Sequence, residues 1–191
     1  MIRIILLCIT SFAIGSGLND WIENKSKLIK NNDFKISFNY TITNKKEKNK
    51  KHIYQNIEYY NIKDHEQVLK IENRYILFHP DYSEVINETS KQKFLDKKDE
   101  DLEKMKDKLL SIFVDNDFKI IKLSDSKFLL SLNNYYLNIN IIFNNKTEAI
   151  TELSFTENSY LINTNNLVIS AIDSVSIDTS DWDSYEVIDL R

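Results

Sequence analysis

The chain has 191 residues, a mass of 22.6 kDa and a net charge of -4 at neutral pH. This length favours one domain that buries a core without crosslinks, and a single cysteine excludes disulfide scaffolds and zinc fingers. A hydrophobic content of 42% is too high for a disordered chain, and with a pI of about 5.5 we expect no nucleic-acid partner.

The N-terminal residues have the pattern of a secretory signal peptide. Met1-Ile2-Arg3 precedes an apolar stretch from Ile4 to Ile14, and Gly15-Ser16-Gly17 follows it. One positive charge, an apolar centre and small residues behind it are typical of such a leader. We therefore expect residues 1–17 to be the leader and residues 18–191 to be one exported domain. The alternative is a buried first strand, because short apolar runs fit both interpretations.

Removal of residues 1–17 would leave a mature chain without cysteine and without glycine, because Cys8, Gly15 and Gly17 are the only ones. Glycine is the residue that most readily adopts positive φ. We therefore expect Asn and Asp, which tolerate positive φ, to form the turns.

A helix and a long strand are predicted after the leader. Apolar residues at spacings of three and four predict an amphipathic helix over 19–31. Strict alternation from Phe34 to Ile42 then predicts a strand with one polar face. The lysine-rich run 45–51 is interpreted as a solvated hairpin tip, with a binding patch as the alternative. Further strands are expected at 53–62, 66–71, 74–79 and 83–88.

From about Lys97 the apolar spacing changes from that of a strand to that of a helix. Leu102, Met105, Leu109, Leu110 and Phe113 form one apolar stripe. Strand patterns return at 118–123, 127–132, 135–143, 149–155 and 167–177. Together these elements predict an α+β domain in which a large antiparallel sheet is covered on one face by two helices.

The sequence contains no recognisable catalytic or metal-binding motif. His52, His65 and His79 lack the spacing of a helical zinc site. A Gly-x-Ser-x-Gly elbow and a glycine-rich phosphate loop are both missing. Close carboxylates such as Asp181 and Asp183 lie in highly charged segments, where a solvated surface is the ordinary interpretation. We therefore expect no enzyme activity, no metal and no cofactor; a catalytic pair that only the fold assembles is the alternative.

Aromatic residues are abundant, with ten Tyr, ten Phe and two Trp. Most of them must serve an ordinary core. A sheet that curves around helices can, however, leave part of its concave face as an apolar cavity. Alternating strands offer side chains of the kind that such a cavity needs, among them Phe38, Tyr40, Tyr59, Tyr75, Leu77 and Leu137.

This arrangement resembles the LolA family, the periplasmic carriers that move lipoproteins from the inner to the outer membrane of Gram-negative bacteria. The likeness includes the leader, the short helix and the strand Phe34–Thr41. Residues Asn73–Asp81 are similar to a family segment of the type Asn/Asp-Gly-x-x-aromatic/aliphatic-x-Tyr-x-Pro, with Pro80 at the proline position. Arg74 replaces the glycine of that segment. The family's basic-Pro element, which carries an arginine linked to cargo release, has no counterpart around residues 61–64.

The resemblance implies a fold, a function and partners. The fold would be an incomplete β-barrel, LolA/LolB-like, with helices over the concave face of a curved antiparallel sheet. The protein would be a monomeric periplasmic chaperone that shelters lipoprotein acyl chains in its cavity. It would receive them from an inner-membrane lipoprotein-releasing ABC transporter and pass them to a LolB-like outer-membrane acceptor or to the membrane itself.

We expect strand side chains to line the cavity and a movable helix to cover it. The expected lipid-binding residues are Phe34, Ile36, Phe38, Tyr40, Ile42, Tyr59, Tyr75, Leu77, Leu137, Ile139 and Phe155. The expected cover consists of Leu109, Leu110 and Phe113. These assignments depend on which strand face is concave. The alternatives are an envelope sensor that binds lipid or lipoprotein without transporting it, a structural domain with a filled core, and an envelope hydrolase.

Overall fold

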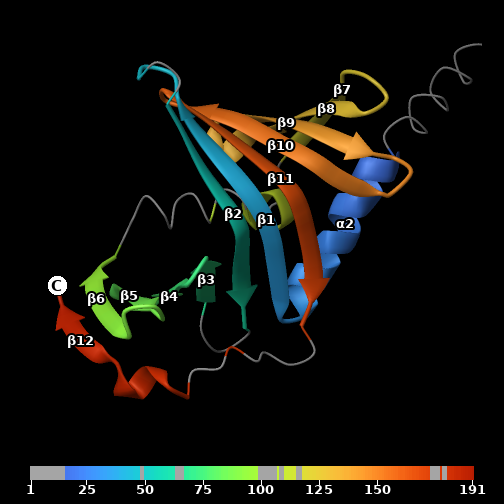
Figure 1. Cartoon of the computed structure of the whole chain (residues 1–191). Helices are drawn as coiled ribbons and strands as arrows, with labels where there is room; N and C mark the ends of the chain where they lie inside the picture. The colour runs from blue at the N-terminus through green and yellow to red at the C-terminus, as the bar shows by residue number, and fades with distance from the viewer. Residues whose placement is uncertain are drawn as a thin grey trace, which may run out of the picture.

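The computed structural model describes residues 16–47, 50–62, 67–98, 107, 110–114, 118–172, 177 and 180–191. In these residues one long helix, α2 (Ser16–Asn31), accompanies a single sheet of twelve strands (Figure 1). The strands are β1 (Phe34–Asn44), β2 (Lys50–Asn61), β3 (Gln67–Ile71), β4 (Arg74–Phe78), β5 (Tyr82–Asn87), β6 (Gln92–Lys97), β7 (Phe118–Lys122), β8 (Lys127–Leu132), β9 (Leu137–Asn144), β10 (Ala149–Glu157), β11 (Tyr160–Ala171) and β12 (Glu186–Asp189). Two short 3-10 helices are η1 (Asn133–Tyr135) and η2 (Trp182–Ser184). Residues 107 and 110–114 are also helical.

The strand order is β12-β6-β5-β4-β3-β2-β1-β11-β10-β9-β8-β7. Two antiparallel meanders, β1 to β6 and β7 to β11, are joined where β1 pairs with β11. The pairing of β12 with β6 is parallel, whereas the other described strand pairs are antiparallel. Among the described strands, the terminal strands β12 and β7 do not pair with each other, so the sheet is open. Figure 1 shows the sheet curving with α2 and residues 110–114 behind β1 and β11, which confirms the predicted fold class.

Strand β1 lies between two β-bulges, and these bend the sheet. Its register with β2 shifts between Phe38 and Tyr40, and its register with β11 shifts nearby. The neighbouring strands contain an extra residue at these points, where Asn56 and Asn166 adopt φ values of 53° and 55°. The Asn39 side-chain oxygen accepts a hydrogen bond of 2.8 Å from the backbone N–H of Asn56. Because bulges increase strand bending and twist, they give the centre of the sheet its curvature.

Positive φ occurs at Asn56, Glu72, Lys91, Tyr136, Glu148, Asn158 and Asn166 among the described non-glycine residues. The expectation that Asn and Asp would fill these positions is met only by the three Asn. At the hairpin between β3 and β4, Arg74 begins the strand, and the left-handed residue is Glu72. The left-handed region costs a residue with a Cβ atom about 1–2 kcal/mol relative to the right-handed region, so this chain carries backbone strain at several turns.

The observed elements differ from the predicted ones in three respects. The strand expected at 167–177 is β11, which starts at Tyr160 and ends at Ala171. Its first half was not predicted because the polar residues Asn163 and Asn165 interrupt the apolar pattern. Strands β6 and β12 were not predicted, since both are rich in charged side chains. Helix α2 begins at Ser16, within the expected leader, and residues 1–15 lie outside the described part. No helix in the described ranges is long and apolar enough to cross a membrane.

Two apolar clusters lie on opposite faces of the sheet. The larger one packs Leu18, Trp21 and Ile22 of α2 against the inner face. The smaller one lies on the outer face, where it consists of Val68, Tyr75, Leu77, Ile86 and Trp182. The faces are distinct because Val68 and Leu69 are consecutive in β3 and alternate. The C-terminal segment that carries Trp182 therefore covers the outer face, and the helices cover the inner face.

Candidate functional site: an apolar cavity under the curved sheet

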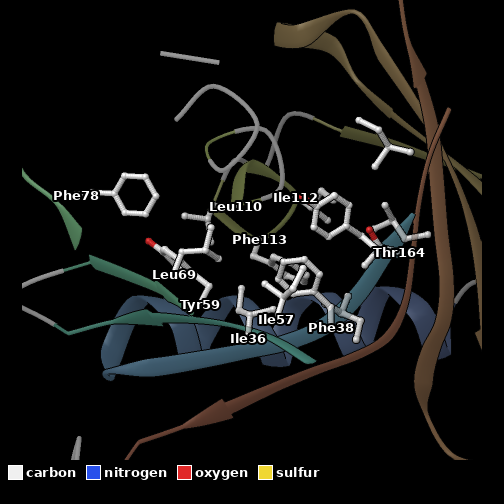
Figure 2. Close-up of a pocket in the computed structure, with 14 residues that line it drawn as sticks. Ile36, Phe38, Ile57, Tyr59, Leu69, Phe78, Leu110, Ile112, Phe113 and Thr164 are labelled. Atoms are coloured by element: carbon white, nitrogen blue, oxygen red, sulfur yellow. The ribbon is translucent and has the colours of Figure 1, made fainter. Parts of the chain in front are cut away.

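A cavity lies between the inner face of the sheet and helical residues 110–114 (Figure 2). It contains about 870 Å³ of empty space, which includes its opening to solvent. The lining consists of Ile36, Phe38, Tyr40, Ile57, Tyr59, Leu69, Phe78, Leu110, Ile112, Phe113, Leu153, Ile162, Thr164 and Leu167.

The bulges next to β1 decide which side chains face this cavity. Alternation along β1 directs Phe38 and Tyr40 inward. The extra residue in β2 shifts the pairing so that Ile57 lies opposite Phe38 and Tyr59 lies opposite Ile36. Both β2 side chains consequently face inward and join the lining. The same irregularities that curve the sheet therefore also bring an aromatic-rich lining together on its concave side.

The helical cover is fastened to α2. The Ser26 hydroxyl donates a hydrogen bond to the backbone oxygen of Phe113. The Trp21 and Phe113 rings meet edge to face, with their centroids 5.9 Å apart. The Lys25 ammonium in turn donates to the backbone oxygen of Ile169 at 2.9 Å, which ties α2 to β11. The cover is thus connected to the sheet through α2.

Tyr59 is more deeply buried than Tyr40, the other tyrosine of the cavity lining. It is 4% exposed, and its ring packs against Phe34 with the centroids 6.1 Å apart. Its hydroxyl is buried and finds no hydrogen-bond partner within the described chain. Burial, and then the negative charge of Asp107, raise the pKa of Tyr59, so the phenol stays protonated. A buried hydroxyl without a partner destabilises the folded state by about 1–3 kcal/mol.

The adjacent residue shows how an ordinary tyrosine hydroxyl is satisfied. Tyr60 points to the outer face, where its hydroxyl donates to Glu58 at 2.7 Å. The Lys35 ammonium donates to the other carboxylate oxygen of Glu58 at 3.0 Å. Two consecutive tyrosines of one strand therefore differ: among the described residues, the outward hydroxyl has a hydrogen-bond partner and the inward one has none.

The other polar atoms of the lining are few. Tyr40 stacks on Tyr54 with ring centroids 4.7 Å apart, and burial together with Tyr54 raises the pKa of Tyr40 to about 12. Thr164 is 3% exposed and lies at the end of the cavity away from Tyr59 (Figure 2). The described lining residues include no charged side chain. An apolar molecule with one or two neutral polar groups is therefore the kind of ligand that this lining fits.

Part of the predicted lining and cover meets at the cavity. Ile36, Phe38, Tyr40 and Tyr59 line it, as do Leu110 and Phe113 of the cover. Other members lie elsewhere: Phe34, Leu137, Ile139 and Phe155 are buried in the main core, and Ile42 is half-buried in β1. Leu109 is outside the described residues.

Tyr75 and Leu77 do not face the cavity, although we expected both there. In the β3–β4 hairpin Leu77 pairs with Val68, and both point outward, whereas the next pair places Leu69 inward. Tyr75 packs on Trp182 with the ring centroids 5.0 Å apart. The sequence Tyr-Ile-Leu-Phe of β4 is apolar at every position because both faces of this strand are covered. Alternation could not show which face was concave.

Several lining residues were not identified from the sequence. Ile57, Leu69 and Phe78 belong to predicted strands, but only the observed registers place them inward. Thr164 could not be recognised as a lining residue from the sequence, since it lies in the half of β11 that was not predicted. The unidentified members are Ile57, Leu69, Phe78, Ile112, Leu153, Ile162, Thr164 and Leu167.

His52 and His79 lie apart from the cavity lining. His79 stacks on Tyr82, and its Nε2 atom is 3.3 Å from a carboxylate oxygen of Glu84. His52 is exposed on β2, and His65 is outside the described residues. Within the part of the chain that the structure describes, no group of three or more His, Cys, Asp or Glu could hold a metal ion.

Comparison with known proteins gives a likeness in structure only. No protein-family model and no curated protein matches the sequence. LolA superfamily protein NE2245 from Nitrosomonas europaea is similar over 81% of this chain and 93% of its own, with 8% identity and a TM-score of 0.37. An uncharacterized conserved protein from Thermus thermophilus is similar over 90% of this chain and 96% of its own, with 5% identity and a TM-score of 0.43. At these scores the likenesses assign no function to this chain.

Proposed function

We propose that this protein shelters the acyl chains of lipids or lipoproteins in the cavity under its sheet and carries them between membranes. The observation that supports this most directly is the lining, in which thirteen of fourteen side chains are aliphatic or aromatic and the remaining one is Thr164. Moving an acyl chain from a bilayer into water costs about 0.8 kcal/mol for each CH₂ group. A carrier must therefore replace the bilayer with apolar protein surface.

The resemblance of the sequence to the LolA family supplies the route in this proposal. A leader at residues 1–17 would direct the chain to the periplasm. An inner-membrane ABC transporter would load the cavity, and a LolB-like acceptor or the outer membrane would receive the cargo. The absence of a counterpart to the family's basic-Pro element in the sequence implies that release is controlled here by other residues.

The attachment of the cover indicates how the cavity would open in such a carrier. Leu110, Ile112 and Phe113 line the cavity from the helical side. The hydrogen bond from Ser26 to Phe113 holds this segment on α2. Displacement of residues 110–114 would widen the space without breaking any strand pairing, since those residues are in no strand. A ligand would then replace the contacts that the cover makes in the empty protein.

Two adjacent residues of β11 provide a matched test. Leu167 lines the cavity, whereas Val168 is 57% exposed on the outer face. We expect Leu167→Asp to lower lipid binding by more than about tenfold, because a carboxylate in an apolar site is poorly solvated. Val168→Asp adds the same charge one residue away and should bind as the unmodified protein does. Native mass spectrometry of both variants, isolated from the envelope and shown to be folded by circular dichroism, measures the bound lipid.

The outcomes separate the candidate functions. Lipid-free protein from the native envelope, together with no uptake of added lipid, would contradict the carrier. Bound lipid with outer-membrane lipoproteins still in place after depletion of the protein would indicate the sensor instead. Lipoproteins retained in the inner membrane after depletion are the result expected of the carrier.

A further inference from the structure

We propose that Tyr59 donates a hydrogen bond to the carbonyl oxygen of an acyl ester, so that the cavity selects esterified acyl chains over free fatty acids. This inference rests on the proposed function, since it requires an acyl chain in the cavity. It adds a polar contact and a ligand class to a site that otherwise offers apolar surface.

The unpaired hydroxyl of Tyr59 is the starting point. Its oxygen is buried and has no partner among the residues described. Figure 2 shows this side chain at the end of the cavity that Leu69 and Phe78 also line. Buried polar groups in native proteins are nearly always hydrogen-bonded, and exceptions commonly mark a ligand or another functional role. A group bound in the cavity next to Tyr59 would supply the missing partner.

The neighbouring residue Tyr60 has a hydrogen-bonded hydroxyl, and this comparison makes the unpaired hydroxyl of Tyr59 informative. Tyr60 places its hydroxyl on the outer face, 2.7 Å from a carboxylate oxygen of Glu58. Strand β2 thus supplies a hydrogen-bond acceptor, Glu58, for the tyrosine whose role is structural. A phenylalanine at position 59 would fill the same space beside Phe34 without burying a polar atom. The hydroxyl is therefore explained by binding better than by packing.

The chemistry of the surroundings selects among possible acceptors. A protonated phenol is a donor, and an ester carbonyl is a neutral acceptor that needs no counter-ion. The negative charge of Asp107 acts on Tyr59, and it would repel a carboxylate held at the same place. The lining that the structure describes carries no basic side chain to neutralise one. A fatty acid would therefore have to bury its charge unpaired, whereas an ester would not.

The test compares three ligands of equal chain length: methyl palmitate, palmitate and hexadecane. The full chain is isolated, stripped of bound lipid and titrated with each ligand in competition with an apolar fluorescent dye. We expect Tyr59→Phe to weaken binding of methyl palmitate about 3- to 10-fold, the effect of one neutral hydrogen bond. Hexadecane binding should not change. Tyr60→Phe is the matched control and should alter neither affinity.

A spectroscopic measurement distinguishes a direct contact from a change of shape. With methyl palmitate labelled with ¹³C at its carbonyl carbon, the carbonyl infrared band should lie at lower wavenumber in the wild-type complex than in the Tyr59→Phe complex. Equal bands and equal affinities in the two complexes would overturn the inference, as would tighter binding of palmitate than of methyl palmitate. If the wild-type protein binds all three ligands with no dependence on Tyr59, the carrier proposal stands and the inference fails. If it binds none, both fail.

Discussion

The two faces of the sheet bury apolar clusters that are closed in different ways. On the outer face the indole of Trp182 packs over Val68, Tyr75, Leu77 and Ile86. On the inner face α2 and residues 110–114 close the cluster, and a cavity is left between them and the strands. Trp182 closes the outer cluster by direct packing, whereas residues 110–114 cover the inner face from a separate helical segment. The difference shows that the cavity does not follow from apolar composition, which both faces share.

The hydroxyls of the adjacent residues Tyr60 and Tyr59, which lie on opposite faces, also differ in their hydrogen bonding. The outer face pairs the hydroxyl of Tyr60 and the ammonium of Lys35 with Glu58. The inner face buries the hydroxyl of Tyr59 without a partner in the described chain. Satisfied polar groups stabilise a folded structure, and unsatisfied ones are kept where function requires them. The outer face also buries one oxygen without a partner in the described chain, Oδ1 of Asn163, although the amide nitrogen of Asn163 donates to Glu152. Tyr59 differs in that its unpaired oxygen belongs to a side chain of the cavity lining.

The largest effect is expected from removing the side chain that closes the outer face. Trp182→Ala should lower the free energy of unfolding by about 3–5 kcal/mol, because it leaves a void beside Tyr75. Urea unfolding followed by circular dichroism measures this change. Val187→Ala is the control, since Val187 is 57% exposed on neighbouring β12. Equal stabilities of the two variants would show that Trp182 does not hold the outer cluster, and lipid binding of folded Trp182→Ala should be unaltered.

A matched pair of tyrosine substitutions should change stability in opposite directions. Tyr59→Phe removes an unpaired buried hydroxyl and should raise the free energy of unfolding of the lipid-free protein by about 1–2 kcal/mol. Tyr60→Phe removes the hydrogen bond to Glu58 and should lower it by about 1 kcal/mol. Thermal and urea unfolding of lipid-stripped protein measure both. A loss of stability in Tyr59→Phe would mean that the hydroxyl has a partner in the folded chain.

Much of the sheet follows from the sequence where one strand face meets solvent or polar groups. The alternation from Phe34 to Ile42 identified β1 and its inner face, and with it Phe38 and Tyr40 of the lining. Alternation failed in β4, which is apolar from Tyr75 to Phe78 because Trp182 covers its outer face and the cavity lies on its inner face. Strands β6 and β12 were not predicted because charged residues interrupt their apolar patterns, and β12 lies at an edge of the sheet, where strands are commonly charged.

The cavity itself could not be predicted from the sequence for a different reason. Apolar periodicity indicates which side chains avoid water, but an unfilled space depends on how strands far apart in the chain approach one another. Leu153 of β10 and Leu69 of β3 line the same cavity, although β2, β1 and β11 lie between their strands in the sheet. Tyr59 could be assigned to the lining, yet its missing hydrogen-bond partner is visible only once all neighbours are placed.

Loosening the inner cover should affect ligand exchange more than stability. Ser26→Ala removes the hydrogen bond to the backbone oxygen of Phe113 and should destabilise the closed cover by about 1 kcal/mol. We expect faster hydrogen exchange in residues 110–114 and faster release of bound lipid, with little change in β4 or β5. Unchanged exchange in that segment would show that the contact between Trp21 and Phe113 holds the cover without the hydrogen bond.

The smallest effect is expected from pH, and it should act on the outer face alone. Burial works to raise the pKa of Glu58, but hydrogen bonds from Tyr60 and Lys35 and the charges of Lys35 and Lys70 lower it more, so the net pKa is below its ordinary value. A lowered folded-state pKa means that the stabilisation is complete above the unfolded value of about 4.3 and is lost as pH falls through the folded value.

The carboxylate is partly exposed, so the effect should be about 1 kcal/mol or less. Glu58→Gln should therefore be less stable than the wild type at pH 7, and the difference should shrink towards pH 3. Lipid affinity of the folded protein should be the same at both pH values, because the lining of the inner face that the structure describes contains no group that titrates in this range. A loss of affinity at pH 3 in protein that is still folded would show that the two faces are coupled. Lipid binding would then depend on the ionic interactions of Glu58 with Lys35 and Lys70 on the outer face as well as on the cavity lining.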